Sequence, residues 1–215
     1  DSHVHLTFSS DGQVVDNILR ESVPVQLARA TGNAQRALAA GVTTAVDCGG
    51  ITEVVVALRD GIAAGRLHGP RLLVSGAPLT TTAGHCHWLG GAADSQDELI
   101  RTMRSHVAAG VDLIKVMVTG GNITEGSNPA RLQFAPESIA ALARECERLG
   151  RPLVTHAHTT EAVELSASVG ARIIAHATCA RADGSIELDT ATIKHLLDAE
   201  CFIDPTLMVA RPGYG

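Results

Sequence analysis

The sequence lacks an excess of positive charge, and it lacks any long apolar run. Its 215 residues carry 17 Lys and Arg against 23 Asp and Glu, a formal net charge of −6. Such a chain does not present the basic surface that binds nucleic acid or an anionic membrane, so we expect neither partner. No apolar run approaches the roughly 20 residues that cross a bilayer.

The sequence also lacks the signs of an exported, disulfide-bonded protein. The first residues do not contain the basic segment followed by an apolar segment that is typical of a signal peptide. The sequence opens with Asp1 rather than Met, which leaves a removed leader as an alternative. The five cysteines are odd in number, widely spaced and without a CxxC pair. These features are typical of reduced thiols, and we expect a cytoplasmic protein.

Apolar residues make up 45% of the chain and fall into two alternating patterns. Short β-branched runs predict strands at residues 3–6, 43–47, 71–75, 112–118, 152–156, 172–176 and 201–205. Segments of helical period predict helices at residues 33–40, 54–64, 94–109, 136–149, 160–168 and 189–199. Alternation of this kind predicts βαβ units and a parallel sheet.

Seven such strands in one domain, residues 1–215, predict an α/β fold of the (β/α)8 TIM-barrel type that lacks its eighth strand. A doubly wound open sheet is the alternative, but it would place a GxGxxG turn after the first strand, where residues 6–12 have nothing similar. The last residues, 211–215, are turn-like and follow the seventh strand directly. We therefore expect a partial barrel, part of a longer chain.

Polar side chains with metal-binding chemistry lie at the ends of four predicted strands. They are His3, His5, Lys115, His156 and His176. Because the carboxyl ends of barrel strands meet at one rim, we expect these side chains to converge there. His3 and His5 are two residues apart on a strand, so they point to the same side and can hold one Zn²⁺-type ion.

Two of these positions leave alternatives open. His158 competes with His156 as the metal ligand, and His156 is preferred because it directly ends its apolar run. His158 is then predicted to lie in the following loop, where it orients a ligand from outside or faces the substrate. Lys115 lies within an apolar run, where a free ammonium is costly to desolvate. It either pairs with a carboxylate such as Asp47, or it reacts as a neutral amine with CO₂ to give a carbamate that can bridge two metals.

Six segments together resemble the metal-dependent amidohydrolase superfamily, and most closely the branch with imidazolonepropionase-like amidohydrolases and barrel-type Xaa-Pro dipeptidases. They are DSHVHL (1–6), AGVTT (40–44), TTAGHC (81–86), DLIKVMVTGG (112–121), VTHAH (154–158) and IAH (174–176). The resemblance implies two divalent metal ions of the Zn²⁺ class. It implies His3 and His5 on the more buried ion, carboxylated Lys115 as the bridge, and His156 and His176 on the more exposed ion.

The implied activity is hydrolysis of an amide-type C–N bond by a metal-bridging hydroxide, in a dipeptide, an N-acyl amino acid or a cyclic amide. Family members also carry a catalytic Asp on strand eight and a small β-sandwich, and neither is found in these residues. The alternatives are a lactonase or phosphotriesterase-type ester hydrolase on the same scaffold, and a non-catalytic barrel protein.

The long loop at residues 80–91 follows the third predicted strand and is expected to face the substrate. His85 and Trp88 are its candidate substrate-binding residues, while His87 is expected to pack within the loop. His68, His106 and His195 lie in helical or turn contexts and are predicted to be on the surface. The open strand edges of a partial barrel also favour self-association, so a homo-oligomer is among the states that we expect.

Overall fold

The computed structural model describes residues 1–181, 185–186 and 188–210. Its strands are β1 (Thr44–Asp47), β2 (Arg71–Val74), β3 (Ile114–Met117), β4 (Leu153–Thr159), β5 (Ile173–Ala180) and β6 (Phe202–Asp204). Its helices are α1 (Val14–Arg20), α2 (Val23–Ala39), α3 (Thr52–Ala63), α4 (Gln96–Ala108), α5 (Pro136–Arg148), α6 (Thr160–Ser168) and α7 (Thr190–Asp198), with short 3₁₀ turns η1 (His87–Leu89) and η2 (Leu207–Ala210).

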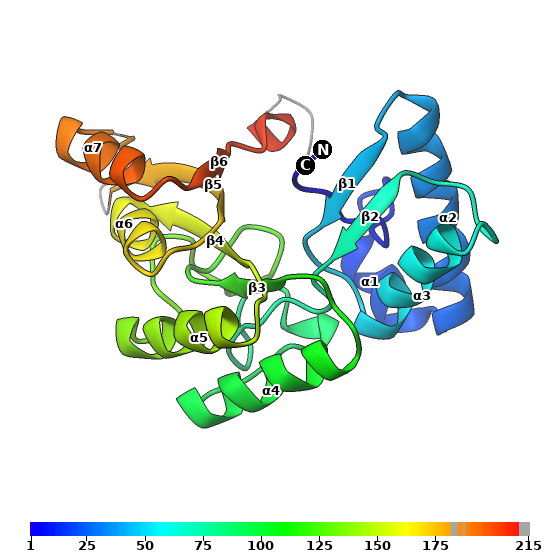
Figure 1. Cartoon of the computed structure of the whole chain (residues 1–215), viewed down its shortest axis with the longest axis horizontal. Coiled ribbons are helices and arrows are strands. Elements are labelled where there is room, and N and C mark those ends of the chain that lie inside the picture. The colour runs from blue at the N-terminus through cyan, green and yellow to red at the C-terminus, as the bar shows by residue number, and fades with distance from the viewer. Residues whose placement is uncertain (182–184, 187, 211–215) are drawn as a thin grey trace.

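The strands form one curved, parallel wall with the helices on its outer side (Figure 1). β1 pairs with β2, and β3, β4, β5 and β6 pair in that order. Two connections join these sheets: Asp112 donates its N–H to the Val74 carbonyl at 2.9 Å, and Leu79 forms a bridge with Val116. This is the predicted barrel topology, and no eighth strand occurs within the described ranges.

The first predicted strand, residues 3–6, is reduced to a single bridge between Val4 and Asp47. Two backbone hydrogen bonds of 2.9 Å hold it, from Val4 N to the Val46 carbonyl and from Cys48 N to the Val4 carbonyl. The segment therefore lies beside β1, in the place of the first barrel strand. At the other end of the wall, the Ser2 hydroxyl donates to the carboxylate of Asp204 on β6.

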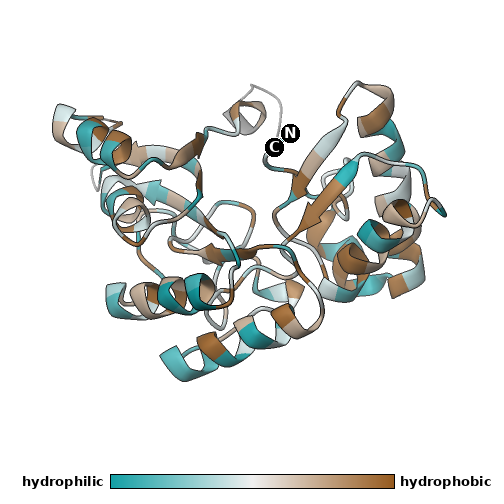
Figure 2. Ribbon diagram, in the orientation of Figure 1, coloured by the Kyte–Doolittle hydropathy of each residue, from teal (hydrophilic) through white to brown (hydrophobic). Residues whose placement is uncertain are grey.

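The core lies between the strands and the inner faces of the helices. The strands are largely hydrophobic, and the helices alternate between hydrophobic and hydrophilic positions (Figure 2). All four residues of β3 are buried, as expected for a strand covered on both faces. Helix α4 begins with a capping box formed by Ser95 and Glu98. None of the helices in the described ranges is long and apolar enough to span a membrane.

Two sequence predictions about helices need correction. Helix α1 was not predicted, and α2 begins at Val23 rather than at residue 33. Pro24 lies in the first turn of α2, where its missing N–H leaves no hydrogen bond unmade, while the interior Gly32 weakens the helical pattern. The sequence therefore contained a helix start that the apolar periodicity alone did not indicate.

The prediction that His106 is a surface residue is wrong. His106 is buried on α4, at the spacing that places it on one stripe with Leu99 and Met103. Burial lowers the pKa of its imidazole to about 4. His68 is exposed as predicted, while His195 is half-buried against Ser168.

Candidate metal centre

The predicted metal-binding side chains converge at the carboxyl ends of the strands. His3 and His5 come from the segment beside β1, Lys115 from β3, His156 from β4 and His176 from β5. The ring centres of His156 and His176 are 4.4 Å apart, and those of His3 and His176 are 5.3 Å apart. The curvature of the wall thus brings the first segment and β5, far apart in the sequence, to one site.

His3 and His5 face each other through their Nε2 atoms, which are 3.2 Å apart. Two nitrogens bound to one tetrahedral Zn²⁺ at about 2.0–2.1 Å would lie about 3.3 Å apart. Burial lowers the pKa of His5 to about 4 and moves the pKa of His3 far below its usual value, so both rings are neutral near pH 7. The donor set and its geometry therefore fit one shared cation.

His156, His158 and His176 form a second group, in which one ring nitrogen from each lies within 4.8 Å of the others. Each ring is also held by a hydrogen bond: His156 Nε2 to the Gly120 carbonyl at 3.0 Å, His158 Nδ1 to Thr178 Oγ1 and His176 Nδ1 to Thr206 Oγ1, both at 2.7 Å. Such outer contacts orient imidazoles that bind metals. Burial, the largest cause, lowers the pKa of all three, for His176 to about 2.

The prediction that His158 lies in a loop is wrong, because β4 continues through Thr159. Two residues apart on one strand, His156 and His158 both reach His176. Both are therefore candidate ligands from β4. His176 itself has a φ of 69°, a left-handed conformation that non-glycine residues rarely adopt outside turns and functional sites.

Lys115 is 1% exposed and lies close enough to these histidines for its charge to lower the pKa of each of them. Its Nζ has no hydrogen-bond partner among the described residues, and burial lowers its pKa. The alternative of an ion pair with Asp47 is not found, since the Asp47 oxygens accept the N–H groups of Leu6 and Gly49 at 2.9 and 3.0 Å. An unpaired, buried amine favours the neutral form that reacts with CO₂.

The candidate substrate-binding residues surround this group. The His85 ring is buried, with its centre 4.7 Å from that of His156. Trp88 lies on η1 with its ring centre 5.7 Å from that of Phe8, and Phe8 stacks on His5 at 4.5 Å. His87 is exposed and its ring bonds the Gly84 carbonyl within its own loop, as predicted.

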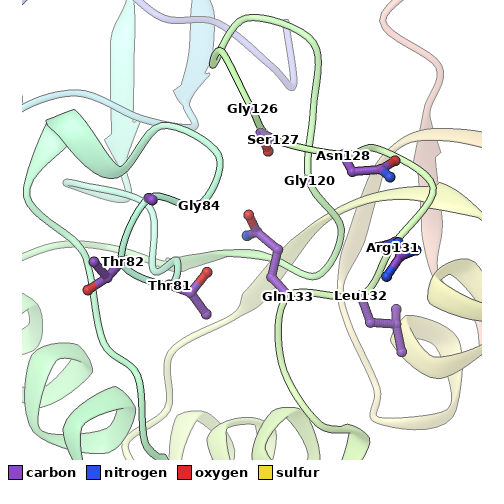
Figure 3. Close-up of a pocket in the computed structure, with 11 residues that line it drawn as sticks. Thr81, Thr82, Gly84, Gly120, Gly126, Ser127, Asn128, Arg131, Leu132 and Gln133 are labelled. Atoms are coloured by element: carbon purple, nitrogen blue, oxygen red, sulfur yellow. The ribbon is translucent and has the colours of Figure 1, made fainter.

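A cavity of about 250 Å³ lies beside His85, between the loops at 81–84 and 120–133 (Figure 3). Gln133 holds the two loops together: its Oε1 accepts the His85 N–H at 2.6 Å and its Nε2 donates to Thr80 Oγ1 at 3.0 Å. Arg131 is the one charged residue among those that line the cavity. Sequence reasoning missed Gln133, Arg131, Thr178 and Thr206, because a single residue of these types carries no distinguishing pattern.

Comparison with known proteins agrees with this architecture. The sequence model of the Amidohydrolase family matches residues 1–211. Aspergillus niger ochratoxinase is 28% identical over an alignment of 179 residues, and the match covers 71% of this chain and 36% of that protein.

Among solved structures, a Xaa-Pro dipeptidase with bound methionine has a TM-score of 0.83 at 25% identity, over 97% of this chain and 53% of that one. A. niger ochratoxinase has a TM-score of 0.84 at 22% identity, over 98% of this chain and 52% of that one, which shows a shared fold. The chain thus spans between a third and about half of the length of these relatives. The predicted superfamily is confirmed, and the chain belongs to the Amidohydrolase family.

Proposed function

We propose that this chain supplies the metal-binding part of a binuclear hydrolase that cleaves amide-type C–N bonds. The observation that carries the proposal is the convergence of neutral imidazoles around a buried lysine whose Nζ has no hydrogen-bond partner among the described residues. A structural role alone does not explain that arrangement, because a buried, unpaired amine destabilises the fold unless another group satisfies it.

In this proposal His3 and His5 hold one divalent cation, and His176 with His156 or His158 holds the other. A carbamate formed on Lys115 would supply the anionic oxygen ligand for the two cations. When two cations of the Zn²⁺ class are bound, they lower the pKa of a shared water and polarise the carbonyl of the substrate.

The remaining residues of the site orient the substrate. His85 is neutral near pH 7, because burial lowers its pKa to about 3, so its imidazole contacts a substrate carbonyl or carboxylate without adding charge. Phe8 and Trp88 provide an apolar wall beside His5. The side chain of Gln133 keeps His85 in place by accepting the backbone N–H of His85.

The cavity beside His85 favours substrates with a free carboxylate. Its lining combines the Arg131 guanidinium with hydroxyl and amide groups and contains no acidic residue. A guanidinium matches the geometry of a carboxylate. Dipeptides and N-acyl amino acids therefore fit better than cyclic amides, in line with the dipeptidase among the similar structures.

The test uses the full-length protein, loaded with Zn²⁺ in the presence of bicarbonate. Metal analysis is combined with assays on dipeptides, N-acyl amino acids, cyclic amides, lactones and phosphotriesters. We expect two ions per chain and turnover of amides with a free carboxylate. Hydrolysis of esters alone would support the lactonase alternative, and two bound ions without any turnover would support a non-catalytic barrel.

A further inference from the structure

We propose that Asp47 is the positioning residue of one half of the metal centre, the half that contains His3 and His5. Asp47 ends β1 and is fully buried. Its Oδ2 accepts the N–H of Leu6, the residue after His5, and its Oδ1 accepts the N–H of Gly49. The inference rests on the proposed metal centre and assigns a role to a residue that binds no metal itself.

The backbone pairing of the first segment with β1 stops at Val4, which makes the last two ladder bonds. Beyond Val4, the Asp47 carboxylate replaces the ladder by binding Leu6 N at 2.9 Å. His5 lies between these two attachments. The carboxylate therefore fixes the backbone on the far side of His5, where the β-pairing no longer does.

The same carboxylate also fixes the ring of His5. It holds the Gly49 N–H, and the Gly49 carbonyl accepts His5 Nδ1–H at 2.9 Å. Because a carbonyl oxygen can only accept a hydrogen bond, this contact requires that Nδ1 carry the proton of the neutral ring. The lone pair is then on Nε2, which faces His3. Gly49 also leaves little room, since a Cβ there would lie 3.1 Å from His5 Cε1.

An aspartate is suited to this position because it accepts one N–H on each oxygen, from two separate segments. An asparagine has a single acceptor oxygen and would turn its NH₂ toward one of these N–H groups. The other half of the centre does not depend on Asp47, because its histidines are held by Gly120, Thr178 and Thr206. Loss of Asp47 should therefore affect one metal position and spare the other.

The experiment compares zinc binding by full-length wild type, Asp47→Asn and Asp112→Asn. Asp112 is a matched control, because its carboxylate also accepts a backbone N–H, from Val74, but pairs with Arg59 of α3 and does not bind the segment that carries His3 and His5. We expect Asp47→Asn to bind one ion normally and the second about 10- to 100-fold more weakly, as for other outer contacts of metal ligands. Asp112→Asn should lower the melting temperature and keep both ions.

A second measurement does not depend on bound metal. In metal-free protein with ¹⁵N-labelled imidazoles, wild-type His5 should show one fixed Nδ1–H tautomer, which Asp47→Asn should convert to a mixture while His156 keeps its own.

If Asp47→Asn does not fold, Gly49→Ala disturbs the same link from the other side and should have the same selective effect. Equal loss of both ions, or retention of both with an unchanged His5 tautomer, would overturn the role of Asp47. If the wild type binds no zinc, while Asp47→Asn still changes the tautomer of His5, the metal centre is overturned and the link from Asp47 to His5 stands.

Discussion

At the scale of single residues, the contacts of one ring nitrogen decide what the other nitrogen can bind. His5 and His156 each donate to a carbonyl, through Nδ1 and Nε2 respectively. The remaining lone pairs are therefore on His5 Nε2 and His156 Nδ1. His158 and His176 bond to hydroxyl groups, which both donate and accept, so their tautomers are free to adjust when a cation binds.

Replacing Lys115 tests the carbamate directly, and residues 1–215 contain only one other lysine, Lys194. In full-length protein, Lys115→Ala should abolish the ¹³C carbamate signal formed from labelled bicarbonate and lower the bound metal from two ions per chain. Lys194→Ala is the control, since Lys194 is exposed and pairs with Asp198. Two ions per chain in Lys115→Ala would contradict the bridging role.

Buried His106 should make the protein sensitive to acid. Its pKa is about 4 in the folded state and near 6.5 when unfolded, so below pH 6.5 the unfolded chain binds a proton that the folded chain does not. Its neutral form thus contributes stability above pH 6.5 that is lost as the pH falls toward 4, about 2 kcal/mol at about pH 5.

Urea unfolding at neutral and acidic pH measures this effect. His106→Leu should reduce the fall in unfolding free energy between the two conditions, because it removes the titrating ring. Met103→Leu on the same buried stripe of α4 changes no titrating group and should leave the pH dependence as in the wild type. An identical dependence in wild type and His106→Leu would exclude the explanation.

At the scale of elements, two loops act as one unit around His85. The loop before η1 is tied to the loop after β3 by His85 N to Gln133 Oε1 and by Cys86 N to Thr124 Oγ1, at 2.6 and 2.9 Å. Gly121 lets the second loop approach the His85 ring, since a Cβ there would lie 2.5 Å from the ring atoms. The position of His85 over His156 therefore depends on this close approach.

Gly121→Ala should move the His85 ring and raise KM for amide substrates, with a smaller change in melting temperature. The control is Gly32→Ala inside α2, where a Cβ meets only Arg36 at an ordinary 3.6 Å. That change should stabilise the protein by about 0.5–1 kcal/mol and leave KM unchanged. An unaltered KM in Gly121→Ala would show that His85 does not contact the substrate.

At the scale of the whole molecule, β6 pairs only with β5 in the described part of the chain and exposes apolar side chains. Phe202 is 58% and Ile203 is 42% exposed. Open edges with exposed apolar residues favour self-association. We expect residues 1–215, expressed alone, to form oligomers that dissociate in the Ile203→Lys variant.

Light scattering coupled to size-exclusion chromatography measures this mass. Leu19→Lys is the control, because Leu19 is 64% exposed on α1 and not on the strand edge. If both substitutions lower the mass equally, general surface hydrophobicity rather than the β6 edge causes the association. A monomeric wild-type segment would contradict the prediction outright.

The barrel topology could be predicted from the sequence because each strand and helix is a local pattern. The predicted strand at 71–75 and helix at 160–168, for example, match β2 and α6 within one residue. The convergence of His3, Lys115, His156 and His176 then follows, since parallel strands bring their carboxyl ends to one rim. The prediction failed for His106 because the apolar pattern does not show that a histidine is buried. It failed for α2 because the same pattern does not show where that helix starts.

The sequence by itself determined which residue types stand at the strand ends, because strand periodicity and β/α alternation are local properties of the chain. Only the tertiary structure decided which nitrogen of each histidine is free, that Lys115 lacks Asp47 as a counter-ion, and that His158 joins β4. Each depends on a partner far along the chain, such as Gly49, which is 44 residues from His5, and Thr206, which is 30 residues from His176. Such hydrogen bonds form only once the curved sheet has brought these segments together.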